Sequence, residues 1–189
     1  PENKDSDFTW KDFQARNNNE LVAIFGNFVN RVVVLTNKYW NGCIPRRNES
    51  LNNDEIILNE IIQYPDKIGY SINNYKFRDA LFDLINLARL GNKYLADNEP
   101  WKLIKTNPAR TETILNISLQ IVYSLSVLCE PFMPKTSKKL SKILNSTFSS
   151  WNCAKNINNL TPNHQIGKPQ HLFEIITDEK INTEIEKLN

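Results

Sequence analysis

The sequence predicts an all-α fold, a bundle of five major helices with an irregular C-terminal extension. Only five of the 189 residues are glycine, which disfavours a turn-rich β fold. Apolar residues recur at three- and four-residue steps over long stretches, the period that places them on one face of a helix. We expect residues 1–11 to form a leader, residues 12–146 the bundle, and residues 147–189 an irregular extension that packs on it.

The first helix is predicted from Asp12 to Trp40. Its apolar face is formed by Leu21, Ile24 or Phe25, Phe28, Val32, Leu35 and Tyr39. Its opposite strip is polar and carries Asn27, Asn30, Arg31 and Lys38. The helix should stop at Asn41-Gly42, because residues of these types tolerate the left-handed backbone that follows a helix.

The next two helices are predicted over about Asn53 to Tyr75 and over Tyr75 to Asp97. Pro65 lies inside the first of them and predicts a kink or a break there. The stretch from Asn98 to Trp101 then starts a short helix, since Asn98 can cap it and Pro100 fits its first turn. We expect this short helix to end near residue 105.

The longest apolar pattern follows Pro108 and predicts a helix from Ala109 to Cys129. Its apolar face is broad, so this helix should be the most buried of the bundle. Two prolines, at 131 and 134, separate it from a last major helix over Lys135 to about Ser146. Beyond that the pattern is irregular, and the polar tail from residue 178 is expected to be a frayed helix.

The sequence contains little that could catalyse a reaction or bind a metal. It has no nucleophile elbow, P-loop or H-E-x-x-H motif, and its three cysteines form no C-x-x-C pair. The two histidines have no nearby nucleophile or metal-ligand pattern. We therefore predict no catalytic residue, no metal and no cofactor within this chain.

Net charge and hydropathy limit the classes of partner and the cellular compartment that we expect. The net charge of +2 does not by itself indicate a nucleic-acid-binding protein, and the clustered lysines from residue 135 to 142 are typical of a solvated face. No apolar run approaches the roughly 20 residues of a membrane span, and the polar start is unlike a signal peptide. We expect a cytoplasmic protein without membrane contact.

Asn27 and Arg31 are the first candidate binding residues. They are four positions apart, so their side chains project from one helical face a turn apart. An amide and a guanidinium could together bind the pairing edge of an exposed base. Spacing alone favours the alternative, a solvated polar strip.

Trp101 is the second candidate, because it follows Pro100 in the first turn of a short helix. An indole at such a corner can form a flat platform on which an unpaired base stacks. The alternative is that Trp101 fills the core, and spacing alone favours that alternative. The other three tryptophans, at 10, 40 and 151, are interpreted as packing residues.

Several ordered stretches resemble the anticodon-binding domain of methionyl-tRNA synthetases. One is GNFVNR, from Gly26 to Arg31, and another is RNNNEL just before it. The resemblance continues through LARLGNKY and NEPWK, through EPFMP, and through HQIGKP with the following Leu172-Phe173. It covers about residues 8 to 176, in the order that the family has.

This resemblance implies a helical bundle that binds the anticodon loop of methionine tRNA and reads its CAU anticodon. It implies that Asn27 and Arg31 contact anticodon bases, chiefly the first, a cytosine. It also implies that Trp101, supported by Pro100, stacks on that base.

The resemblance further implies a parent enzyme, a methionine-tRNA ligase that uses ATP and in many members carries zinc. Its catalytic domain would precede Pro1, and Phe8, Trp10 and residues 16–19 would face it. Two alternatives stay open. One is the anticodon domain of a related class I synthetase, for valine, isoleucine, leucine or cysteine. The other is a helical protein-interaction module that binds no RNA.

Overall fold

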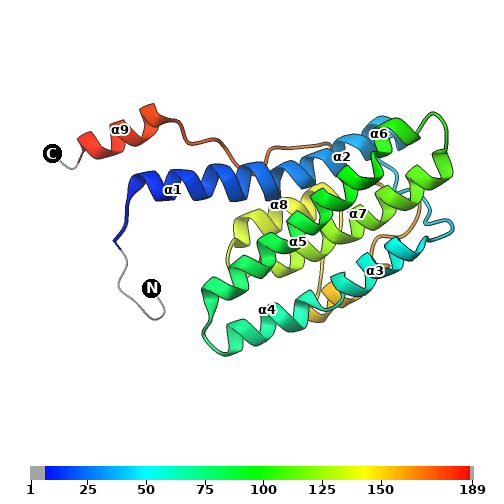
Figure 1. Cartoon of the computed structure of the whole chain (residues 1–189), viewed down its shortest axis with the longest axis horizontal. Coiled ribbons are helices and arrows are strands. Elements are labelled where there is room, and N and C mark those ends of the chain that lie inside the picture. The colour runs from blue at the N-terminus through cyan, green and yellow to red at the C-terminus, as the bar shows by residue number, and fades with distance from the viewer. Residues whose placement is uncertain (1–6, 188–189) are drawn as a thin grey trace.

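The computed structural model describes residues 7–187 and has the predicted all-α fold (Figure 1). In chain order its elements are α1 (Trp10–Arg16), a π-helix η1 (Asn17–Gly26), α2 (Asn27–Trp40), α3 (Asn52–Ile61), α4 (Tyr64–Asn73), α5 (Phe77–Asn98), α6 (Pro100–Leu103), α7 (Pro108–Leu128), α8 (Pro134–Leu144), a 3₁₀ helix η2 (Trp151–Lys155) and α9 (Asp178–Glu186). Within residues 7–187 the β structure is limited to an isolated bridge between Cys43 and Gln165.

The first helical run starts at Trp10, inside the predicted leader, because the Thr9 side chain accepts a hydrogen bond from the Asp12 N–H and caps it. Leader residues 1–6 lie outside the described part. The run then continues to Trp40, but its middle ten residues are a π-helix rather than the predicted α-helix. A periodicity argument cannot foresee this, because the wider turn is stabilised by contacts from elsewhere in the chain.

Those contacts come from both sides of the π-helix. The Asn92 side chain on α5 donates to the Ile24 carbonyl at 2.9 Å. On the other side, Asn18 makes a reciprocal pair with the Ile176 backbone, with both bonds at 2.9 Å. The Asn92 bond satisfies a carbonyl of the π-helix, and the Asn18 pair attaches the π-helix to the backbone of the C-terminal extension.

The second predicted helix is two helices, because the chain breaks between α3 and α4. Pro65 lies in the first turn of α4, where its missing N–H costs little, and not in a helix interior. The break lies between Ile61 and Tyr64, because Pro65 has no N–H with which to bond the Ile61 carbonyl and so cannot continue α3.

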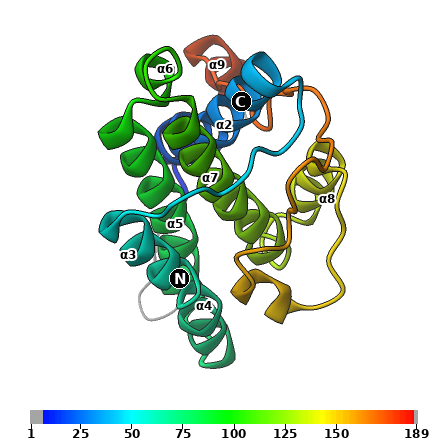
Figure 2. The same cartoon turned by 90° about the vertical axis from the view of Figure 1, so that its right-hand side faces the viewer.

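The predicted most buried helix is α7, in which every residue from Thr113 to Leu128 is buried. Figure 2 shows it surrounded by α2, α5, α8 and the irregular segments. Its buried polar side chains bind those segments. Gln120 donates to the Leu160 carbonyl at 2.8 Å, Asn116 to that of Pro45 at 2.9 Å, and Ser124 to that of Ala154 at 3.2 Å.

The C-terminal extension follows the bundle as a strap, visible in yellow to red in Figure 1. Its apolar side chains Leu160, Ile166 and Leu172 are buried against the bundle. At its end, α9 lies beside α1.

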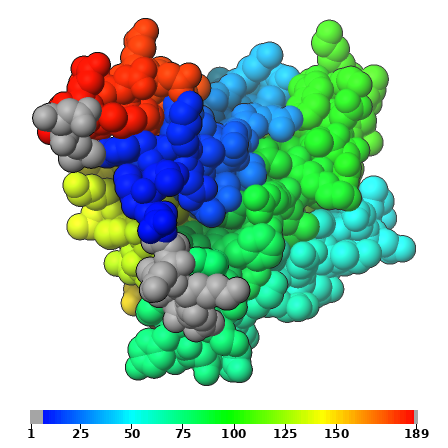
Figure 3. All heavy atoms as spheres, turned by 60° about the vertical axis from the view of Figure 1, so that its left-hand side comes forward, coloured from blue at the N-terminus to red at the C-terminus, as the bar shows by residue number. Residues whose placement is uncertain are grey.

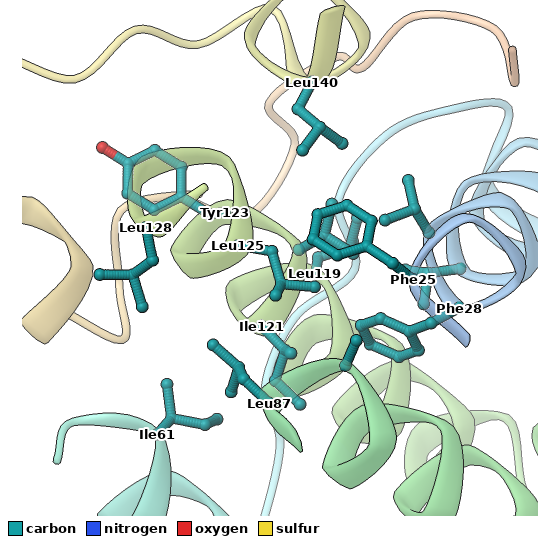
Figure 4. Close-up of a cluster of buried hydrophobic side chains, with 14 of the residues drawn as sticks. Phe25, Phe28, Ile61, Leu87, Leu119, Ile121, Tyr123, Leu125, Leu128 and Leu140 are labelled. Atoms are coloured by element: carbon teal, nitrogen blue, oxygen red, sulfur yellow. The ribbon is translucent and has the colours of Figure 1, made fainter. Parts of the chain in front are cut away.

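Helix α2 approaches α5 closely at Gly91. A Cβ atom at this glycine would lie 2.3 Å from Cζ of Phe28, a ring that is fully buried. Figure 4 shows Phe25 and Phe28 pointing from the first helical run toward Leu87 and Leu119 in the core. The glycine is therefore required by packing, since its backbone is helical and has no unusual torsion.

Replacing Gly91 with alanine is expected to lower the free energy of unfolding by about 1 to 2 kcal/mol. Overpacking against Phe28 costs about 1–3 kcal/mol, and the better helix propensity of alanine offsets up to about 1 kcal/mol. Urea denaturation followed by circular dichroism measures this change. Gly69→Ala on α4 is the matched control, because its Cβ would lie 3.4 Å from Nε1 of Trp151, an ordinary contact. A G91A protein as stable as G69A would contradict this packing argument.

Candidate functional site

The structure brings Arg31 and Trp101 together. The guanidinium carbon of Arg31 lies over the indole at 4.9 Å from the ring centroid. Arg31 comes from the middle of α2 and Trp101 from α6, two elements about seventy residues apart in the chain. Both side chains are half-buried. A cation held over an aromatic face is an attractive arrangement, and it places the guanidinium donors beside a surface on which bases can stack.

The corner that carries Trp101 is built by an unusual backbone. Glu99 ends α5 in the left-handed conformation, with φ 42°, and its N–H bonds to the Leu95 carbonyl at 3.0 Å. Pro100 then starts α6 and is buried. Because a left-handed residue reverses the helix direction and proline restricts the next one, the indole is projected back toward α2.

A buried polar network anchors the end of α5 just before this corner. The Asp54 carboxylate on α3 is fully buried and accepts hydrogen bonds from Tyr94 Oη at 2.6 Å and from the Leu51 N–H at 2.8 Å. Arg110 on α7 forms a two-point contact with the same carboxylate, one bond measuring 2.9 Å. Arg110 also donates to Asn98 Oδ1 at 2.7 Å. The network therefore joins α3, α5 and α7 to the residue that precedes the corner.

This network perturbs the ionisation of its members. Burial alone would raise the pKa of Asp54, but the hydrogen bonds from Arg110, Tyr94 and the Leu51 N–H outweigh it, so this pKa lies below its ordinary value. Burial, and then the hydrogen bond to Asp54, raise the pKa of Tyr94. Asp54 is thus charged and Tyr94 neutral at physiological pH, as the hydrogen-bond pattern requires.

The other predicted site residues are placed as follows. Pro100 is buried beneath the corner, and Asn27 is exposed one turn before Arg31 on the same helix. Asn27 lines a pocket formed with the C-terminal strap rather than the indole corner itself. The structure therefore brings Arg31 and Trp101 together, with Pro100 next to Trp101 in the chain, while Asn27 lines the pocket beside the C-terminal strap.

Sequence reasoning missed the groups that position this site. Arg31 is predicted as a reader of base edges, and its stacking on Trp101 is not foreseen. Asp54, Arg110 and Tyr94 look like ordinary polar residues in the sequence. One signal was present for Asp54, because an acidic residue near the start of an amphipathic helix can bond to the backbone of its first turn. Its two distant partners leave no local signal.

The described residues contain no group of three or more metal-ligating side chains. Among the same residues, no helix is both long enough and apolar enough to cross a membrane.

Two family descriptions match the chain. Residues 44–188 match the anticodon binding domain of methionyl tRNA ligase. Residues 1–33 match the class I tRNA synthetases of the methionine type. The first match contains Pro100 and Trp101, and the second contains Asn27 and Arg31, so the candidate surface is drawn from both.

Curated relatives and solved structures resemble the chain over nearly all of its length. It is 55% identical to the methionine–tRNA ligase of Flavobacterium psychrophilum, covering 100% of this chain and 28% of that protein. It is 51% identical to the methionine–tRNA ligase of Bacteroides fragilis, again covering 100% of this chain and 28% of that protein. The fold resembles the apo methionyl-tRNA synthetase of Mycobacterium tuberculosis, with a TM-score of 0.85 at 22% identity over 92% of this chain and 36% of that one. The chain thus spans about 28% of the length of these curated relatives.

Replacing Asp54 with asparagine is expected to destabilise the fold by about 3–5 kcal/mol near neutral pH, because Arg110 would lose its buried partner. Since the native pKa of Asp54 is depressed, its ionic contribution is fully present above its unfolded pKa of about 3.9 and is lost as pH falls through the lower native value. The destabilisation caused by D54N should therefore shrink on acidification below about pH 4.

Urea denaturation of both proteins from about pH 6 to about pH 2 measures this difference. Asp97→Asn is the control, since Asp97 is exposed and its ion pair with Lys93, at 3.3 Å, lies on the surface. A D54N effect that stays constant over this pH range would contradict a charged Asp54.

Proposed function

Because this chain belongs to the family of methionyl-tRNA ligase anticodon-binding domains, we propose that it binds the anticodon loop of methionine tRNA and reads its CAU sequence. The observation that carries the proposal is the stacked pair of Arg31 and Trp101 at a half-buried corner. This corner combines a platform for a base with a fixed fork of hydrogen-bond donors. Such a combination suits an unpaired base better than a duplex, because only an unpaired base offers both its face and its pairing edge.

The first anticodon base, a cytosine, is proposed to stack on Trp101. One indole face is covered by the Arg31 guanidinium, so the base stacks on the opposite face or takes the place of the guanidinium. Pro100 supports the indole from the bundle side. Stacking supplies affinity with little sequence preference, about 1–3 kcal/mol per base.

Selectivity is proposed to come from the polar groups. Cytosine presents one amine donor and two acceptors on its pairing edge. Arg31 can donate to the acceptors, and the Asn27 amide one turn away can donate or accept. A wrong base would leave buried polar groups unpaired, at a cost of about 1–3 kcal/mol each.

The complete protein is proposed to be a methionine-tRNA ligase that uses ATP. The match of residues 1–33 to the methionine class I synthetases supports a catalytic domain joined to the first helical run. The ligase names of the relatives, of which this chain spans about 28%, support the same activity. The ATP and methionine sites then belong to the catalytic domain, and the role of this chain is to select the tRNA.

Replacing Trp101 with alanine should weaken binding of a CAU anticodon stem-loop by about 1–3 kcal/mol, because the stacking platform is removed. Trp101→Phe should lose less, because it keeps an aromatic face. Fluorescence anisotropy with the complete protein measures the affinities, and circular dichroism checks the fold. Phe82→Ala on α5 is the control, an exposed aromatic residue at another place on the surface. Unchanged affinity in a folded W101A protein would favour the protein-interaction alternative.

Replacing Arg31 with lysine should reduce discrimination at the first anticodon base more than it reduces overall binding. Lysine keeps the charge but lacks the planar fork that matches two acceptors at once. The measurement is the ratio of affinities for stem-loops with cytosine and with uridine or adenine at that position. We expect about tenfold discrimination in the unmodified protein and a smaller ratio in R31K. A preference for another first base would instead indicate a different class I synthetase.

A further inference from the structure

A strongly basic stretch of the sequence is not used by the proposed anticodon site. Residues 131–173 contain six lysines and no aspartate, glutamate or arginine, whereas the other 146 residues contain 17 basic and 21 acidic side chains. The small net charge of the whole chain therefore conceals a separation of charge along it. A local excess of one sign attracts partners of the opposite sign even where the total charge is close to zero.

Four of these lysines lie on one face of α8, which we call the basic face. All four are exposed, and at about 100° per residue they fall within an arc of about 100° around the helix; they are Lys135, Lys138, Lys139 and Lys142. The buried side chains of α8 lie on the opposite side and pack into the core. Figure 2 shows α8 outside α7, and in Figure 3 the yellow spheres of this part of the chain lie at the surface. The basic face is therefore open to a partner.

The charges of the basic face are not neutralised within residues 7–187. Six other lysines of that part form ion pairs with carboxylates, among them Lys155 with Asp66 at 2.6 Å. The four lysines of α8 form none there, and α8 itself contains no acidic residue. Like charges three and four positions apart on a helix repel one another, and Lys135 in the first turn also opposes the positive end of the helix dipole. The basic face therefore lowers the stability of the free protein, and a bound polyanion would offset this.

The basic face is joined to the helix that carries the proposed anticodon site. The N–H of Gly167 on the strap donates to the Ile143 carbonyl of α8 at 2.6 Å, and the Gly167 carbonyl accepts from Asn37 of α2 at 3.0 Å. Lys168 is the next residue of the strap and is exposed at this junction, where no carboxylate among residues 7–187 pairs with it. A ligand that extends away from α2 along the strap therefore meets positive charge at Lys168 and then on α8.

We propose that the basic face, together with Lys168, binds the phosphate backbone of the tRNA outside its anticodon loop. This inference rests on the proposed function, which supplies the RNA. The row from Lys135 to Lys142 rises by about 10 Å along the helix, and duplex DNA, for comparison, carries about one phosphate charge per 1.7 Å of its axis. The row is thus long enough to meet several phosphates. Lysine suits this role, because an ammonium on a flexible stem binds a phosphate as a point charge and needs no fixed geometry.

Two other anionic partners fit the basic face less well. Helices that bind a membrane surface bury an apolar face in the lipid, but the apolar face of α8 is already packed in the core. The core of a protein interface is usually apolar and aromatic, whereas the exposed side chains of α8 are its four lysines and Pro134. A phosphate backbone needs neither kind of apolar contact.

The test measures binding of full-length methionine tRNA to the complete protein over a series of salt concentrations. One variant is Lys138→Gln with Lys142→Gln, and the other is Lys135→Gln with Lys139→Gln, so that two independent halves of the basic face are examined. Each variant removes two charges, and circular dichroism follows the melting of the free proteins.

The matched control is Lys76→Gln with Lys155→Gln, which removes the same charge from exposed lysines elsewhere on the surface. Lys76 lies between α4 and α5, and Lys155 belongs to the same acid-free stretch as the basic face but is neutralised by Asp66.

We expect each variant of the basic face to weaken tRNA binding by about tenfold at low salt. The slope of log affinity against log salt concentration should become shallower by about 1.5 to 2, because each lost phosphate contact releases about one counterion fewer. The loss should be equal for tRNAs with CAU and with a changed first anticodon base, since backbone contacts carry no base information. The free variants should melt no lower than the unmodified protein, because repulsion on α8 is relieved.

An unchanged salt slope, or a loss of affinity no larger than that of the control, would overturn the proposal and assign the basic face to a partner other than tRNA. A loss that depends on the first anticodon base would also overturn it. The test of the proposed function fails in a different way. If Trp101→Ala weakens binding and the lysine variants do not, only the backbone site is wrong, whereas no effect of Trp101→Ala would show that the anticodon site itself is wrong.

Discussion

The close packing of Phe28 against Gly91 determines where the rest of the structure can lie. A buried ring that meets a helix at a glycine sets both the distance and the register between α2 and α5. Arg31 follows Phe28 by almost one turn, and Trp101 stands on the short helix just after α5. Both members of the stacked pair are therefore carried by elements whose spacing this contact sets. The candidate site is therefore a consequence of core packing at a point that contains none of its residues.

The network around Asp54 holds the C-terminal end of α5, from which the helix that carries Trp101 follows. Burying a carboxylate and a guanidinium costs several kcal/mol before their attraction offsets it, so such a pair is weak evidence of a stability gain. The effect of the Asp54–Arg110 pair on the position of α5 is clearer than its effect on stability. Asp54 accepts bonds from Tyr94 on α5, from Arg110 on α7 and from the N-cap backbone of its own helix, and Arg110 extends the network to Asn98. The residue before the left-handed turn at Glu99 is thereby held in one position, and a stacking platform gains from such rigidity because less order must be imposed on binding.

The proposed binding of RNA depends on surface groups and not on the buried carboxylate. That carboxylate is enclosed by hydrogen bonds and is used for structure. The surface features that support the proposed function are a half-buried aromatic corner and a helix with an amide and a guanidinium one turn apart, beside an open pocket between this helix and the C-terminal strap. The strap is part of this surface, since the π-helix that binds it also forms one wall of the pocket. The chain thus combines its first and last segments on one face.

The helices were largely determined by the sequence itself. Apolar spacing predicts α5, α7 and α8 closely, because each repeats the helical period over several turns and is bounded by asparagine, glycine or proline. The resemblance in Gly26–Arg31 and around Trp101 indicates the candidate residues. The break between α3 and α4 follows from Pro65 and is also predicted by the sequence. Tertiary structure alone decided the π-helix and the contacts of Arg31 and Asp54. These depend on partners tens of residues away, such as Asn92 for Ile24 and Arg110 for Asp54, and no local pattern records which distant group will supply a hydrogen bond.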